Sequence, residues 1–106
     1  MAVSAATRAF VLELFEGLGG VTARPMMGGL FLHRDGQPFA LVTGEERIYL
    51  KASGPLAEAL AAEGSVRFTY RRQGKPTQLR YWSLPDAAVD DPEAACDWAR
   101  RALAAS

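Results

Sequence analysis

Apolar residues recur at helical spacing in three parts of the chain, and each part is bounded by residues that begin or end helices. Serine, proline and aspartate stand where helices start, and glycine stands where two of them stop. The expected helices are one capped by Ser4 and ended by Gly19-Gly20, a short one from Pro55 to Gly64, and one from Asp91-Pro92 to about Ala105. Each carries an apolar stripe, so each is expected to pack along one face.

Between these helices, short apolar runs flanked by turn residues predict strands. They lie at 29–34, 37–42, 47–52, 66–72 and 77–84, and an extra strand around 21–24 is left open. Short loops between neighbouring strands favour a mainly antiparallel sheet with the helices on one face. We therefore expect an α+β two-layer sandwich, in the order helix, three strands, helix, two strands, helix. It forms one domain over 1–106, since 106 residues leave no room for a second core.

Turn chemistry predicts the register of the first hairpin. Asp35-Gly36 is typical of a two-residue type I′ turn, which places Arg34 opposite Gln37. Continued alternation pairs Leu32 with Phe39, Leu30 with Leu41, Leu41 with Ile48 and Phe39 with Leu50. One face of three strands is then wholly apolar and is expected to lie under the helices: Leu30, Leu32, Phe39, Leu41, Ile48 and Leu50.

The second hairpin is expected to turn at Gly74-Lys75. This turn directs one apolar set toward the helices: Phe68, Tyr70, Leu79 and Tyr81. The opposite, open face then carries cations and aromatic rings, which we predict to be an interaction surface: Tyr49, Lys51, Arg67, Arg71, Arg80 and Trp82. No acidic residue interrupts the basic run between Arg67 and Arg80.

Three hypotheses fit this surface. An open sheet face with aromatics and arginines is typical of a protein interface, including a homodimer. The same residue types also occur on platforms for single-stranded nucleic acid. A solvated face whose cations pair with acids from the C-terminal part of the chain is the third. Because the formal net charge is zero, protein contact or a solvated face is favoured over a nucleic-acid partner.

Candidate chemistry elsewhere is sparse. His33 is the single histidine and lacks neighbours at metal-ligand spacing, so a surface strand residue is expected. Cys96 falls on the border of the apolar stripe of the last helix and is interpreted as a small, half-buried packing residue. Gly28-Gly29 precedes a strand and indicates a bulge or a close backbone crossing, not a phosphate loop. We expect no enzyme, no metal and no cofactor. A small-ligand or enzymatic domain that uses the Gly28-Gly29 region and Cys96 is the last-ranked alternative.

Two adjacent methionines, Met26 and Met27, allow an adaptable contact surface, but core filling is the more common role. No apolar run is long enough for a membrane span, so no membrane partner is expected. The single cysteine excludes an internal disulfide and favours a reducing, cytoplasmic location.

Several segments together resemble the N-terminal domain of the TfoX (Sxy) competence regulators. They are the Met26-Met27-Gly28-Gly29 motif, the hairpin through Asp35-Gly36 to Phe39-Ala40-Leu41-Val42, Tyr49-Leu50-Lys51, Phe68-Thr69-Tyr70, Tyr81-Trp82-Ser83-Leu84-Pro85 and Trp98-Ala99-Arg100-Arg101-Ala102. At the position of Met27 the family more often has phenylalanine, a tolerable apolar exchange.

The resemblance implies a two-layer fold like that of type III secretion chaperones and a link to natural competence, without catalytic residues. Full-length members carry a further C-terminal domain. We expect this chain, which stops at Ser106, to be a stand-alone member that need not regulate transcription.

Overall fold

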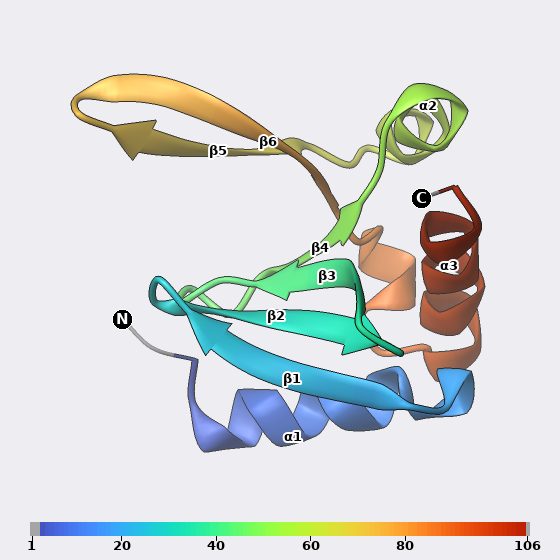
Figure 1. Cartoon of the computed structure of the whole chain (residues 1–106). Helices are drawn as coiled ribbons and strands as arrows, with labels where there is room; N and C mark the ends of the chain where they lie inside the picture. Colours follow the sequence, from blue (N-terminus) through green and yellow to red (C-terminus); the bar gives the residue numbers. More distant parts are fainter. Residues whose placement is uncertain (1–2, 106) are drawn as a thin grey trace.

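A computed structural model describes residues 3–105 of the chain. The helices are α1 (Ala5–Leu14), α2 (Gly54–Ala62) and α3 (Pro92–Ala104), with single 3-10 turns η1 (Glu16–Leu18) and η2 (Asp86–Ala88). The strands are β1 (Val21–Met26), β2 (Gly29–Arg34), β3 (Gln37–Val42), β4 (Ile48–Lys51), β5 (Arg67–Arg72) and β6 (Lys75–Ser83). All strand pairs are antiparallel, in the order β1-β2-β3-β4-β6-β5 (Figure 1).

The α+β two-layer architecture expected from the sequence is confirmed. The strand left open around 21–24 is present as β1, so four strands, not three, precede α2. Figure 1 shows α1 and α3 against one side of the β1–β4 part of the sheet, while the β5–β6 hairpin rises on the other side.

Capping residues explain where the long helices begin. Ser4 Oγ accepts a hydrogen bond from the Thr7 backbone N–H at 3.1 Å. Asp91 Oδ1 accepts one from the Ala94 N–H at 3.2 Å, and Pro92 occupies the first turn of α3. Both caps satisfy backbone donors that have no partner within the helix. The predicted starts of α1 and α3 are therefore correct, although α1 ends at Leu14 and continues only as η1.

Each hairpin with a two-residue loop has positive φ at both loop residues. The pairs are Met27-Gly28 (49° and 79°), Asp35-Gly36 (51° and 83°) and Gln73-Gly74 (53° and 78°). This is the type I′ conformation, whose twist matches that of the strands. The prediction for Asp35-Gly36 is confirmed. The prediction of a turn at Gly74-Lys75 is wrong by one residue, because Gln73 takes the first loop position.

Register in the first hairpin begins as predicted and then slips. Arg34 does face Gln37, but an irregularity between Leu32 and His33 shifts the pairing by one residue. The observed partners are Leu30–Val42, Leu32–Ala40, Ala40–Leu50, Leu41–Tyr49 and Val42–Ile48, so the four predicted pairings are wrong. Leu41 therefore leaves the helix side, and Val42 takes its place in the core.

The main core lies between the sheet and α1 and α3. It includes five of the six apolar residues predicted for this face: Leu30, Leu32, Phe39, Ile48 and Leu50. Phe39 packs edge-to-face on Phe15 with ring centroids 5.4 Å apart. Cys96 packs in the same core, as expected, but it is buried instead of half-buried, and its Sγ contacts the Leu14 carbonyl at 3.6 Å.

Gly29 lies at a close approach of two strands. A Cβ at this position would stand 3.0 Å from the Val42 carbonyl oxygen and 3.2 Å from Leu41 Cδ1. The close backbone crossing expected at Gly28-Gly29 is therefore found at Gly29, while Gly28 occupies a turn.

Gly29→Ala is expected to lower the free energy of unfolding by about 1–2 kcal/mol, because the backbone oxygen of Val42 cannot move without distorting the β2–β3 pair. Urea unfolding measures this change. Gly36→Asn is the control, since nothing lies within 4 Å of a Cβ at Gly36 and asparagine tolerates its positive φ. Equal stability of Gly29→Ala and the parent would contradict the steric argument.

Candidate functional site: the concave sheet face

The face of the sheet turned away from α1 and α3 carries a second apolar cluster. Leu41, Tyr49 and Tyr81 are its buried members. Phe31, Phe68 and Leu79 are half-buried and pack around them. These residues come from β2, β3, β4, β5 and β6, so the cluster extends across most of the sheet.

Ring contacts show that this face is concave. Phe31 on β2 and Tyr81 on β6 stand edge-to-face with centroids 6.1 Å apart. These strands are three places apart in the sheet order, which corresponds to roughly 14 Å in a flat sheet. The sheet must therefore curl strongly, and it brings the β5–β6 hairpin over the open side of β2 and β3 (Figure 1).

One further ring contact ties the hairpin to this face, and another lies within β5. Tyr49 meets Phe68 edge-to-face at 5.1 Å, and Phe68 stacks on Tyr70 at 6.0 Å. Burial alternates along the hairpin, with Phe68, Tyr70, Thr77, Leu79 and Tyr81 as the more covered positions. Burial also raises the pKa of the Tyr81 phenol, so this hydroxyl stays protonated at neutral pH.

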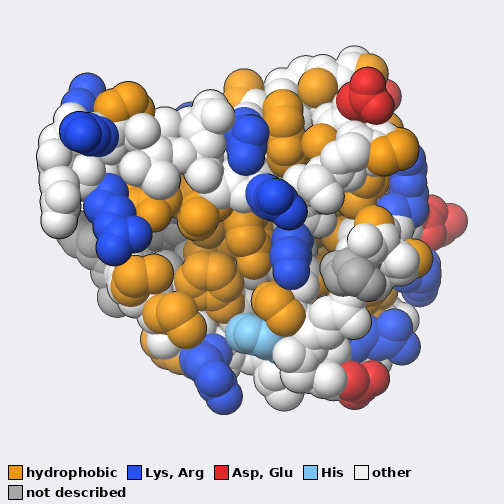
Figure 2. Space-filling view, turned by 45° about the horizontal axis from the view of Figure 1, so that its top comes forward, with side chains coloured by type: hydrophobic (Ala, Val, Ile, Leu, Met, Phe, Trp, Pro, Cys, Tyr) orange, Lys and Arg blue, Asp and Glu red, His pale blue; other side chains and the backbone are white. Residues whose placement is uncertain are grey.

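Cations border the apolar cluster. Arg24 is paired with Phe31 and Lys51 with Tyr81, and residues directly opposite in a sheet share a face. Alternation continues this face to Arg72 and Lys75 at the tip of the β5–β6 hairpin. Among residues 3–105 no ion pair involves any of these four cations. Figure 2 shows apolar side chains in the centre of the view with Lys and Arg among them, and Asp and Glu only toward one margin.

The two charge signs are divided between the layers. Every Asp and Glu lies in a helix, a turn or a loop, and none lies in a strand. Most Lys and Arg residues lie in strands: Arg24, Arg34, Lys51, Arg67, Arg71, Arg72, Lys75 and Arg80. The zero net charge therefore hides a basic sheet, whose charge is balanced by acids in the helices, turns and loops around it.

The interaction surface predicted from the sequence does not form a single face. Tyr49 and Lys51 lie on the concave face, as expected. Trp82 is opposite Leu50 and packs on the other side of the sheet, with Leu56 and Leu60 of α2. Arg67, Arg71 and Arg80 alternate with the concave-face residues, so they share the side of Trp82.

The error arose because the apolar side chains of the second hairpin were assigned to the helix side of the sheet. In the structure β6 pairs with β4 so that Tyr81 is opposite Lys51, and a shift of one residue in such a pairing exchanges the faces of all the side chains of a strand. Phe68, Leu79 and Tyr81 do form one group, as predicted, but this group joins Phe31 and Tyr49 on the concave face instead of lying under the helices.

The methionine pair is also placed differently from the expectation of core filling. Met27 is 89 % exposed at the tip of the β1–β2 turn, and Met26 is 43 % exposed beside it. Met26 lies two residues beyond Arg24 in β1 and therefore on the same side as the concave face. The adaptable contact surface that the sequence left as an alternative fits this position better.

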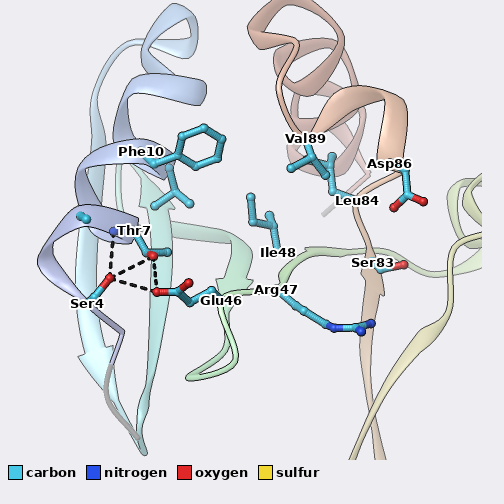
Figure 3. A pocket seen from close by; sticks show the side chains of 12 residues that line it. Ser4, Thr7, Phe10, Glu46, Arg47, Ile48, Ser83, Leu84, Asp86 and Val89 are labelled. Atoms are coloured by element: carbon cyan, nitrogen blue, oxygen red, sulfur yellow. Dashed lines mark hydrogen bonds between the residues drawn. The ribbon is translucent and has the colours of Figure 1, made fainter.

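A separate groove of about 730 Å³ opens between α1 and η2 (Figure 3). Phe10, Ile48, Leu84 and Val89 supply apolar surface to it. On the α1 side the hydroxyls of Ser4 and Thr7 donate hydrogen bonds to one oxygen of Glu46, at 3.0 and 2.6 Å. Together they tie the loop between β3 and β4 to the start of α1.

These two hydrogen bonds lower the pKa of Glu46 from its ordinary value of 4.5, and the bond from Thr7 has the larger effect. The stability that this carboxylate contributes is therefore present above its unfolded-state pKa and is lost as the pH falls through the lowered pKa. Thr7→Ala is expected to raise the pKa of Glu46 toward 4.5, as measured by NMR titration of the carboxyl carbon. An unchanged titration would show that the hydrogen bond does not act in solution.

Candidate metal ligands do not converge in the described part of the chain. Within residues 3–105 no group of three or more His, Cys, Asp or Glu side chains could hold a metal ion. His33 lies half-buried on β2, on the same side as Phe31, which agrees with the expected surface strand position. None of the helices in this range is both long and apolar enough to cross a membrane.

Comparison with known proteins assigns the chain to a family. No curated protein matches the sequence. The TfoX N-terminal domain family does match it, over residues 13–106. This match covers α2, α3 and β1–β6, and so it includes every strand that builds the concave face. The chain therefore belongs to the TfoX N-terminal domain family.

Proposed function

We propose that this chain is a non-enzymatic, cytoplasmic regulatory domain that binds another protein through its concave sheet face. The observation that carries the proposal is an apolar cluster on the side of the sheet opposite α1 and α3, bordered by cations that have no acidic partner within residues 3–105. Membership of a family named for a competence regulator supports a regulatory role. The single cysteine, which is buried, agrees with a reducing compartment.

The exposure of the cluster supports a docking role. Phe31, Phe68, Tyr70 and Leu79 keep part of their apolar surface in contact with solvent, although the rings beneath them are covered. Aromatic side chains of this kind are enriched at the centres of protein interfaces. A partner that covers them removes apolar surface from water, which is the main favourable contribution to association.

The sequence favoured a protein partner or a second copy of the chain, and the charges argue against a second copy at this face. A symmetric dimer would bring together two copies of a face whose border charges are all positive: Arg24, Lys51, Arg72 and Lys75. Like charges across an interface cost several kcal/mol, by order of magnitude. We therefore propose a partner other than a second copy.

Site-specific photo-crosslinking tests this proposal. A benzophenone amino acid at Tyr70 or Phe31, introduced in cells that make the full chain, is expected to capture a discrete protein. The same amino acid at Ala61, an exposed position on α2, is the control and should not capture it. Equal capture from all three positions, or capture of a second copy alone, would refute a hetero-protein interface on the concave face.

Single-stranded nucleic acid is the second candidate, favoured by the division of charge between the layers. Bases stack on exposed aromatic faces, whereas Tyr49 and Tyr81 are only 8 % exposed and contact other rings edge-to-face. Only Phe31, Phe68 and Tyr70 on this face keep part of their rings open to bases, and the zero net charge of the chain ranks this candidate second. Oligonucleotide binding that weakens steeply with salt, and whose salt dependence is reduced by Arg72→Glu, would reverse the ranking.

A further inference from the structure

We infer that the concave face takes an acidic amphipathic helix, with its apolar side on the aromatic cluster and its carboxylates beside the border cations. This inference rests on the proposed function and adds the chemistry of the partner. Three features of the face lead to it: its charge, the condition of the sheet edges and its curvature.

Charge selects an acidic partner. Arg24 and Lys51 flank the cluster near its middle, and Arg72 and Lys75 stand at the tip of the β5–β6 hairpin. No Asp or Glu lies in any strand, so a basic partner would meet only like charge on this face. Carboxylates along the partner would neutralise these cations, speed association and fix its orientation.

The sheet edges select a helix over an added strand. Partners that extend a sheet pair with the backbone of an edge strand, and the edges here are β1 and β5. In β1, Pro25 lacks a backbone N–H, and Arg24 precedes it. In β5, three of six residues are arginine. Charged side chains and proline are features that block pairing at sheet edges.

Curvature and size also fit a helix. The curl of the sheet brings Phe31 of β2 against Tyr81 of β6, so the half-buried apolar side chains form one continuous surface on which a helix can lie. An 18-residue helix is about 27 Å long. This length is comparable with the 32 Å middle dimension of the domain. The exposed side chains of Met26 and Met27 lie at the end of β1 and extend the apolar surface available to such a helix.

The test uses three synthetic 18-residue peptides and the full chain labelled with ¹⁵N. The first peptide is an amphipathic helix with leucine at core spacing and glutamate on its flanks. The second keeps the leucines and replaces glutamate with lysine. The third has the composition of the first in scrambled order. Only the first is expected to shift the amide resonances of Phe31, Tyr49, Phe68 and Tyr81, with an affinity that falls as salt is added.

Matched charge reversals locate the contact. Arg72→Glu is expected to weaken binding of the acidic peptide by about tenfold or more, whereas Arg71→Glu should change it by less than about twofold. The two substitutions change the charge by the same amount on opposite faces of β5. Because both arginines are exposed, neither variant should unfold the domain. Lys51→Glu and Arg80→Glu provide a second pair on β4 and β6.

Each other outcome overturns the inference. Equal binding of the scrambled peptide would indicate nonspecific charge attraction, and binding of the lysine peptide would reverse the charge argument. Shifts confined to backbone amides of β5 would indicate strand addition at the edge. If no peptide binds but Tyr70 still crosslinks to a discrete protein, the proposed function stands and only the partner chemistry is wrong.

Discussion

Replacing Phe39 with alanine is expected to lower the free energy of unfolding by about 3–5 kcal/mol, as measured by urea denaturation. Phe39 has no exposed surface, and its ring packs edge-to-face on Phe15, which joins the sheet to the end of α1. Alanine would leave a cavity that the rigid sheet above it cannot fill. Domains of this size are stable by about 5–15 kcal/mol, so the variant would be close to unfolding at ambient temperature.

Phe10→Ala is the matched control, because it removes the same atoms from a position that is 45 % exposed. It lies on α1, within the groove beside η2 and outside the main core. We expect a loss of less than about 1 kcal/mol. A similar loss for both variants would mean that the core is not centred on Phe39, and would contradict the packing described here.

The sequence was sufficient to predict the fold where local chemistry decides the structure. Ser4 and Asp91 determine the beginnings of α1 and α3 because their side chains accept hydrogen bonds from the first turn. Asp35-Gly36 determines the β2–β3 turn because both residues tolerate positive φ. These features depend on neighbours within a few residues, so a single sequence contains the information needed to predict them.

Register could not be predicted in the same way. The irregularity beside His33 places Phe39 and Ala40 in one core and moves Leu41 to the opposite face. Nothing in the local alternation of apolar residues signals it, since 39–42 is apolar at every position. Where a run is apolar throughout, either register buries apolar side chains, and only packing against the rest of the protein selects one.

The candidate site was predicted in part for the same reason. Both faces of β4 and β6 carry large apolar side chains, with Tyr49 and Tyr81 on one and Leu50 and Trp82 on the other. The prediction that the apolar set of the second hairpin lies under the helices assumed one buried face. The curled sheet buries much of both faces. The helices cover one face, and the β5–β6 hairpin covers part of the other. The absence of acidic residues from every predicted strand was the signal in the sequence that pointed to a basic sheet layer.

Trp82→Ala tests this assignment of faces and has the second-largest expected effect. Trp82 packs against the buried cluster that Leu56 and Leu60 of α2 form with Ala52 and with Ala102 of α3, so it joins β6 to the helical side of the sheet. Its side chain is half-buried, and we expect a loss of about 2–4 kcal/mol, somewhat below that of a fully buried tryptophan. Since Trp82 does not reach the concave face, the folded variant should bind the acidic helix as tightly as the parent.

Leu79→Ala is expected to have the opposite effects, with a smaller loss of stability and weaker binding. Leu79 is also half-buried on β6, but its side chain belongs to the cluster on the concave face. Its loss should cost less stability than that of Trp82, because no helix packs on it, and should weaken binding of the acidic helix several-fold. Measuring both properties for both variants therefore separates the two faces of one strand. Weaker binding by Trp82→Ala with unchanged stability would restore the arrangement expected from the sequence and refute the one described here.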